Sequence, residues 1–267
     1  MRALHQAIDE DPKILLDPIA PRLIGAEEDR RWMAPLLEHP FAKGWRAGFA
    51  LRARYAEDCL AASVRRGVTQ YVILGAGLDT FAYRQPPWGS LLRIFELDQG
   101  MTQRWKRHKL QAAGIGTPSN VTFVPIDFER VSVGSGLMAA GFAFEAKTLC
   151  SWMGVTQYLS PSALDATLQF GLGLPRESEI VFSFVVPQEA VSGVEADALQ
   201  VAARQAAEAG EPWLTRLRAE DLVAKLRAMG FSHVIPLTPE EARERYFSDR
   251  RDGLMERRGE QLMRAIV

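Results

Sequence analysis

Residues 70–80 read QYVILGAGLDT, and this stretch decides the fold. Its apolar half, Gln70–Leu74, predicts a buried strand, and Gly75 and Gly77 follow directly at the strand's end. Glycine lets the backbone turn tightly and lets a ligand approach it closely. A glycine pair placed after an apolar strand therefore indicates the first unit of an α/β domain that binds a cofactor.

Outward from this stretch, short apolar runs alternate with segments of helical character. We expect strands at residues 92–98, 121–127, 148–153, 179–186 and 231–237, and helices at 41–64, 99–113, 134–141, 161–172 and 219–229. This alternation is typical of parallel sheets, because each crossover between parallel strands needs a long connection, usually a helix. The sequence thus predicts an α/β fold of the Rossmann-like kind, a mostly parallel twisted sheet with helices on both faces.

The 267 residues are expected to form a single domain. Residues 1–67 indicate a helical N-terminal addition, residues 68–240 the Rossmann-like core, and residues 241–267 a C-terminal segment without an assigned structure. The length, together with 47% hydrophobic residues, suffices to bury a full core and excludes a mainly disordered chain.

Charge and composition narrow the classes of partner and compartment. The formal net charge is −1, so neither a nucleic acid nor an anionic membrane is an expected partner. Residues 243–258 are rich in arginine but mix both signs, which indicates a solvated surface. No apolar run is long enough to cross a membrane and no signal-peptide pattern is present, so a cytoplasmic protein is expected. The two cysteines are expected to be buried free thiols, and no cluster predicts a metal site.

Acidic residues end the second and third predicted strands. Asp98 lies 21 residues after Gly77, the spacing at which an α/β unit brings a carboxylate to the hydroxyl groups of a ribose. Asp127 ends the third strand, where it can accept from an adenine amino group while Phe128 covers the ring. Asp79 stands close to where a pyrophosphate would bind, and its negative charge disfavours NAD. The pattern favours a cofactor without phosphates, such as S-adenosylmethionine.

The segment Tyr71–Arg84 resembles the signature of the leucine carboxyl methyltransferase family. Further likenesses to motifs of this family occur at Leu16–Pro18, Arg52–Asp58, Ser151–Leu159, Gly210–Trp213 and Tyr246–Leu254, so the resemblance covers most of the chain. The family consists of class I S-adenosylmethionine-dependent methyltransferases, and the closer likeness is to its bacterial branch. The resemblance therefore implies a methyltransferase with S-adenosylmethionine as cofactor.

The resemblance also implies roles for single residues. Gly75 would contact the methionine part of the cofactor, and Arg52 would bind its carboxylate, with Arg54 in that place if the helix register differs. Asp98, with Glu96 close by, would hold the ribose. The expected cofactor-binding residues are Arg52, Gly75, Ala76, Gly77, Asp79, Glu96, Asp98, Asp127, Phe128 and Met153.

One position departs from the family's pattern. Met153 stands where the phosphatase-methylating branch has a glutamate that faces the cofactor's amino group. A methionine cannot accept a charged hydrogen bond, which argues against a phosphatase as the substrate. A carboxylate on a small molecule, such as a secondary metabolite, is the expected methyl acceptor. Oligomeric state is not predicted.

A carboxylate is ionised at neutral pH, so its methylation needs cations or donors to place it but no general base. Arg84 and Tyr158 are the expected catalytic residues, with Arg52 as a second candidate cation and Gln157 also facing the substrate. A phenol or alcohol acceptor is the alternative and would need a base, although none of the four histidines lies in a motif. An NAD(P)-dependent oxidoreductase and a non-catalytic cofactor-binding module are the remaining alternatives.

Overall fold

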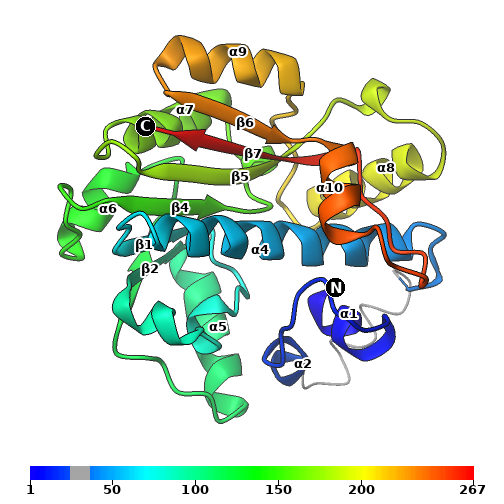
Figure 1. Ribbon diagram of the computed structural model, residues 1–267, viewed down its shortest axis with the longest axis horizontal. Coiled ribbons are helices and arrows are strands. Elements are labelled where there is room, and N and C mark those ends of the chain that lie inside the picture. The colour runs from blue at the N-terminus through cyan, green and yellow to red at the C-terminus, as the bar shows by residue number, and fades with distance from the viewer. Residues whose placement is uncertain (25–36) are drawn as a thin grey trace.

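One seven-stranded sheet runs through the described part of the chain, which is residues 1–24 and 37–267 of the computed structural model (Figure 1). The strands are β1 (Gln70–Leu74), β2 (Arg93–Asp98), β3 (Val121–Pro125), β4 (Thr148–Trp152), β5 (Glu179–Val185), β6 (His233–Leu237) and β7 (Glu260–Ile266). Their spatial order is β3-β2-β1-β4-β5-β7-β6. Strands β1 to β5 are parallel, whereas β7 is antiparallel to both β5 and β6.

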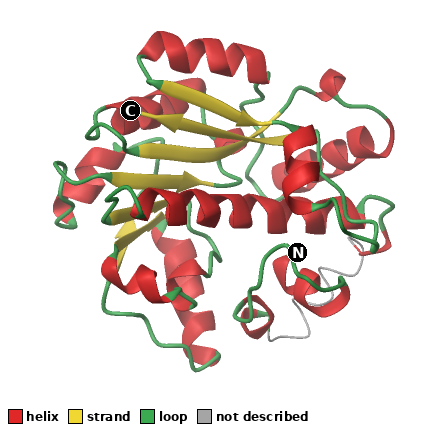
Figure 2. Ribbon diagram, viewed as in Figure 1, coloured by secondary structure: helices red, strands yellow, loops and turns green. Residues whose placement is uncertain are grey.

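Helices cover both faces of this sheet (Figure 2). In the described ranges the α-helices are α1 (Arg2–Ile8), α2 (Ala20–Leu23), α4 (Ala42–Val64), α5 (Gly100–Ala112), α6 (Val133–Ala139), α7 (Pro161–Leu172), α8 (Gly193–Glu208), α9 (Ala219–Met229) and α10 (Pro239–Tyr246). Apolar residues of α6, α7 and α9 share one core with the sheet, and those of α4 and α10 share a second. The predicted α/β class, mostly parallel with helices on both faces, is confirmed.

The burial of β1 explains why its sequence is continuously apolar. Val72 and Leu74 belong to one core, while Tyr71 and Ile73 belong to the other. All five residues of β1 are buried, as expected for a central parallel strand covered on both faces. Because β1 to β4 run parallel, their carboxyl ends meet at one edge of the sheet. Ligands bind at this edge in such folds.

The sheet continues beyond residue 240, where we expected the core to end. Strand β7 lies between β5 and β6, close to the red end of the colour ramp in Figure 1. Its sequence contains charged residues, and Arg264 is neutralised by Glu179 of β5, with Nε to Oε2 at 2.6 Å. The charged residues interrupt the apolar pattern of the strand. Because the partner that neutralises Arg264 is remote in the sequence, the burial of this strand could not be predicted from the local pattern. Helices α8 and α10 also lie outside the predicted helices.

The expected N-terminal addition contains α1, α2 and α4, and its residues 25–36 lie outside the described ranges. Helix α4, which is 23 residues long, crosses in front of the sheet in Figure 1, with α1 and α2 on its far side from β5 and β6. None of the described helices combines the length and the apolar character that crossing a bilayer requires. Cys59 and Cys150 are buried and free, as expected.

Candidate functional site

The glycine loop after β1 turns sharply away from the sheet. The N–H groups of Gly75 and Ala76 both donate to the carbonyl oxygen of Leu97, each at 2.9 Å. Gly75 has a φ of +69°, and a Cβ added there would lie 2.3 Å from Cγ2 of Val155. A glycine is therefore required at position 75, both by the positive φ and by the close approach of Val155.

Gly77 differs from Gly75 in its surroundings. Its φ is +41°, and a Cβ added there would meet no atom closer than 4.0 Å. The space in front of Gly77 is thus open for a ligand to approach the backbone. This open, glycine-lined turn fits a cofactor that packs directly on main chain.

Asp98 at the end of β2 faces the glycine loop. Its Oδ2 accepts a hydrogen bond from the Gly77 N–H at 2.6 Å, and its Oδ1 accepts one from the Gln99 N–H at 2.7 Å. Each carboxylate oxygen can accept a further hydrogen bond, which leaves capacity for two hydroxyl groups. The geometry suits the predicted ribose contact, which stays a prediction.

Asp127 and Phe128 follow the neighbouring strand β3. Asp98 pairs with Pro125 in the register of β2 and β3, so Asp127 lies just beyond the same edge. Its Oδ1 accepts from the N–H of Glu129 at 3.0 Å, and Phe128 packs half-buried against the sheet's core. Both residues are thus at the strand ends that the adenine prediction requires.

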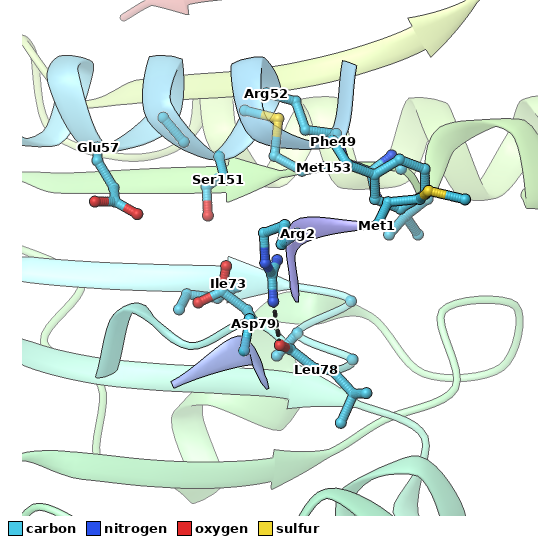
Figure 3. Close-up of a pocket in the computed structure, with 18 of the residues that line it drawn as sticks. Met1, Arg2, Phe49, Arg52, Glu57, Ile73, Leu78, Asp79, Ser151 and Met153 are labelled. Carbon is cyan, nitrogen blue, oxygen red and sulfur yellow. Dashed lines mark hydrogen bonds between the residues drawn. The ribbon is translucent and has the colours of Figure 1, made fainter. Parts of the chain in front are cut away.

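A cavity of about 330 Å³ lies between α4 and the carboxyl ends of β1 and β4 (Figure 3). Figure 3 shows Phe49, Arg52 and Glu57 on the helix side, with Leu78 and Asp79 opposite. Of the predicted cofactor residues, the cavity is lined by Arg52, Gly75, Ala76, Gly77, Asp79 and Met153. Glu96, Asp98, Asp127 and Phe128 do not line it. We call this space the loop cavity.

Glu96, two residues before Asp98 in β2, does not line the loop cavity, and its place beside the ribose stays a prediction. Its side chain is fully buried, and its Oε2 accepts from Nζ of Lys106 in α5 at 2.7 Å. Burial raises the pKa of Glu96, against the opposing charge of Lys106. The physical reason for its placement is this buried ion pair, which holds the carboxylate beneath α5.

The two candidate arginines of helix α4 have different surroundings. Arg52 lines the loop cavity, with its guanidinium 4.0 Å from the centre of the Phe49 ring and its Nη1 2.9 Å from Oε1 of Glu260. Arg54 points elsewhere and pairs with Asp58 on the surface. Of the two arginines, Arg52 is the one that faces the loop cavity, and its contact with the cofactor stays a prediction.

Glu57 brings a carboxylate to the wall of the loop cavity, and sequence reasoning did not single it out. It forms two hydrogen bonds with Arg84, one of them at 3.0 Å. Arg84 also donates to Oγ1 of Thr80 at 3.0 Å and lies 3.4 Å from Asp17. Burial opposes the charge of Arg84, but these acids raise its pKa. Arg84 lines neither this cavity nor the next one, so its catalytic role stays a prediction.

Asp17 joins the N-terminal motif to the glycine loop. This fully buried carboxylate accepts from the Thr80 hydroxyl at 2.7 Å and from the Ala20 N–H at 3.0 Å, and Nε of Arg2 lies 3.1 Å away. Two motifs that are far apart in the sequence, Leu16–Pro18 and Tyr71–Arg84, thus meet in one buried network. That network holds the loop's end in place.

A second cavity, of about 420 Å³, adjoins the loop cavity. Tyr158 and Gln157, predicted to face the substrate, both line it. It shares Met1, Phe49, Arg52 and Gly154 with the loop cavity, so the two spaces meet at these residues. We call it the aromatic cavity, after Trp45, Phe49, Tyr158 and Trp213 in its wall.

No histidine lines either cavity, and all four lie in the described ranges. His5 is buried against Asp9, with Nδ1 2.9 Å from Oδ2, while His108 lines a separate surface hollow. Within residues 1–24 and 37–267, no group of three or more His, Cys, Asp or Glu is placed to hold a metal ion.

Comparison with known proteins gives matches in sequence. The family model described as leucine carboxyl methyltransferase matches residues 1–171. YktD of Bacillus subtilis, named as a candidate S-adenosyl-L-methionine-dependent methyltransferase, is 33% identical over 205 residues, which are 76% of this chain and 67% of YktD. A candidate methyltransferase of the same description from Mycolicibacterium gilvum is 38% identical over 121 residues. That match covers 45% of this chain and 38% of the relative's length.

Solved structures match over nearly the whole chain. A candidate methyltransferase from Thermobifida fusca superposes with a TM-score of 0.61 and 16% identity, covering 94% of both chains. A DUF574 family protein from Streptomyces avermitilis gives a TM-score of 0.59 and 13% identity, covering 93% of this chain and 95% of that one. At such low identity these likenesses concern the fold.

Proposed function

Because the chain belongs to the leucine carboxyl methyltransferase family of S-adenosylmethionine-dependent enzymes, we propose that it methylates an oxygen of a small-molecule carboxylate. One observation carries the choice of acceptor. The place where the two cavities meet holds a cation, Arg52, while no histidine lines either cavity. That set of groups can place an anion but offers no histidine base for a hydroxyl group.

Residues at different strand ends would bind different parts of the cofactor. Gly75 to Asp79 would pack against it, Asp98 would accept from its ribose, and Asp127 with Phe128 would hold its adenine. Arg52 would face its carboxylate, and Glu57 supports the same assignment because it brings a negative charge to a cavity wall on which Met153 offers none. The loop cavity is lined by two arginines, Arg2 and Arg52, and by two acids, Glu57 and Asp79, so it offers both signs of charge to a ligand that carries both.

S-Adenosylmethionine supplies a methyl group on sulfur, whose bond to an acceptor oxygen forms as the carbon–sulfur bond breaks and leaves its electron pair on sulfur. The protein's part is alignment and exclusion of water. A carboxylate acceptor releases no proton in this exchange, so no residue has to take one up. Arg52 lies where the two cavities meet, so its guanidinium would serve both the carboxylate of the cofactor and that of the acceptor.

A hydroxyl acceptor is disfavoured by the state of the two acids in the loop cavity. Glu57 is engaged by Arg84 through two hydrogen bonds, and Oδ1 of Asp79 accepts from the Phe81 N–H at 2.8 Å. Glu57 is thus held as the partner of Arg84, and Asp79 is held in part by the loop backbone. A hydroxyl acceptor that used Glu57 as its base would require Glu57 to release Arg84.

The test uses cofactor labelled in the methyl group and an extract of small metabolites. Methyl esters release labelled methanol in mild alkali, whereas methyl ethers do not. We expect label that becomes volatile after alkali treatment. Label that stays with an alkali-stable product would instead assign a hydroxyl or another acceptor, and the variant Gly77→Val serves as the inactive control.

A further inference from the structure

The aromatic cavity has a wall suited to a flat apolar molecule. Trp45 and Phe49 come from α4, Tyr158 from the turn after β4, and Trp213 from the loop after α8. The N–H of Leu214 donates to the carbonyl oxygen of Gln157 at 2.7 Å, which ties the loop of Trp213 to the same turn. The aromatic wall is thus held from two sides. A volume of about 420 Å³ is in the range of small-molecule sites.

The same cavity has a charged side formed by three residues. Glu260, the first residue of β7, accepts from Nη1 of Arg52 at 2.9 Å and from Nη1 of Arg257 at 3.0 Å. All three side chains are largely buried, with Arg257 and Glu260 each 9% exposed. Glu260 therefore lies between two guanidinium groups, and Glu195 adds a second negative charge near Arg257. Guanidinium groups held in a cavity wall in this way can donate charge-assisted hydrogen bonds to a carboxylate of a ligand.

Two donors beside this cavity lack partners in the described part of the chain. They are Nε of Arg257 and Nε1 of Trp213, and both atoms are buried. Buried donors without a partner are costly, so they favour a ligand that accepts hydrogen bonds. Gly48 permits this arrangement, because a Cβ there would lie 2.4 Å from Cδ of Arg257.

We propose that the aromatic cavity is the acceptor site and takes a small aromatic carboxylic acid, with Arg257 as the residue that selects its carboxylate. The ring lies among Trp45, Phe49, Tyr158 and Trp213, and the anion faces Arg52 and Arg257. This inference rests on the proposed function, since it identifies the class of acceptor. It assigns a role to a residue that sequence patterning had placed on a solvated surface.

The test measures binding by calorimetry to protein saturated with S-adenosylhomocysteine. The probes are 2-naphthoate and its neutral counterpart 2-naphthamide. We expect the naphthoate to bind at least about tenfold more tightly, because a charge-assisted hydrogen bond is lost in the amide. Arg257→Gln should remove most of this preference, while Arg258→Gln at the neighbouring exposed position should keep it.

A second pair of variants keeps the test independent of the buried charges. Ala206 of α8 lines the cavity, whereas Ala207 beside it is exposed. Ala206→Trp should abolish naphthoate binding and leave S-adenosylhomocysteine binding intact, and Ala207→Trp should change neither. The inference is overturned if S-adenosylhomocysteine binds while naphthoate does not, binds no better than the amide, or binds unchanged to Ala206→Trp. If S-adenosylhomocysteine itself does not bind, the proposed function fails first, and the inference with it.

Discussion

The backbone N–H of Gly77 donates to Oδ2 of Asp98 at 2.6 Å, and this bond joins the glycine loop to the end of the adjacent strand. The two residues are 21 positions apart, and they meet because β1 and β2 are parallel neighbours. One carboxylate therefore fixes the loop and keeps capacity for a ribose. Cofactor binding and loop geometry should respond together when Asp98 is changed.

Asp98→Ala should weaken binding of S-adenosylhomocysteine by about tenfold to several hundredfold, because two charge-assisted hydrogen bonds are lost. Asp98→Asn retains an oxygen that can accept from the Gly77 N–H, so its affinity for S-adenosylhomocysteine should lie between that of Asp98→Ala and that of the parent. Calorimetric titration measures both. Asp197→Asn, an exposed acid on α8, is the control and should bind normally. Parental affinity in Asp98→Ala would remove Asp98 from the site.

Valine at the two loop glycines should have opposite consequences. At Gly77 the side chain enters open space, so Gly77→Val should fold, with a strain of about 1–2 kcal/mol from the positive φ, and should lose cofactor binding. At Gly75 the side chain collides with Val155, so Gly75→Val should chiefly lower thermal stability. Thermal unfolding and titration of each variant separate the two effects. Normal cofactor binding by folded Gly77→Val would place the site elsewhere.

Arg84→Gln should cost about 3 kcal/mol of unfolding free energy, because it leaves the largely buried acid Glu57 without its cation and Asp17 with Arg2 alone. Arg84→Lys should recover part of the loss. Denaturant titration gives these values. If Arg84 places the acceptor, as the sequence suggested, the KM for the acceptor would rise in Arg84→Gln while stability stayed near that of the parent.

Glu260 predicts a dependence of stability on pH. Burial opposes its charge, but Arg52 and Arg257 hold its pKa below the ordinary value of 4.5. Its stabilising contribution is therefore complete above pH 4.5 and is lost as the pH falls through the lower, folded-state pKa. Glu260→Gln should be less stable than the parent by about 3 kcal/mol at pH 7, and the gap should narrow in acid. A gap that is constant from pH 7 to 3 would contradict this.

Much of the fold could be predicted because the parallel strands are apolar on both faces. Gln70–Leu74 and Pro161–Leu172 match a predicted strand and a predicted helix without any change of boundary. Strand β7 could not be found in this way, since Glu260 and Arg264 carry charges that are neutralised by residues of α4 and β5. The family, the class of enzyme and the cofactor that the resemblance implied are confirmed.

The candidate site, like the fold, was predictable only where the sequence carries a local signal. The glycine loop and Asp98 carry local signals, namely glycines after a strand and an acid at a fixed spacing. Glu57 and Arg257 carry none, because their positions depend on how α4 packs against the loop and against the segment before β7. The sequence pattern placed Arg257 in a solvated stretch of mixed charge, whereas in the structure its side chain is 9% exposed and pairs with Glu260.

A crystal structure of the protein grown with S-adenosylhomocysteine tests the central claim most directly. The account predicts ligand density in the loop cavity, between Arg52 and the turn from Gly75 to Asp79, with the ribose beside Asp98. Density in another hollow of the surface, or a loop cavity that stays empty at saturating ligand, would contradict it.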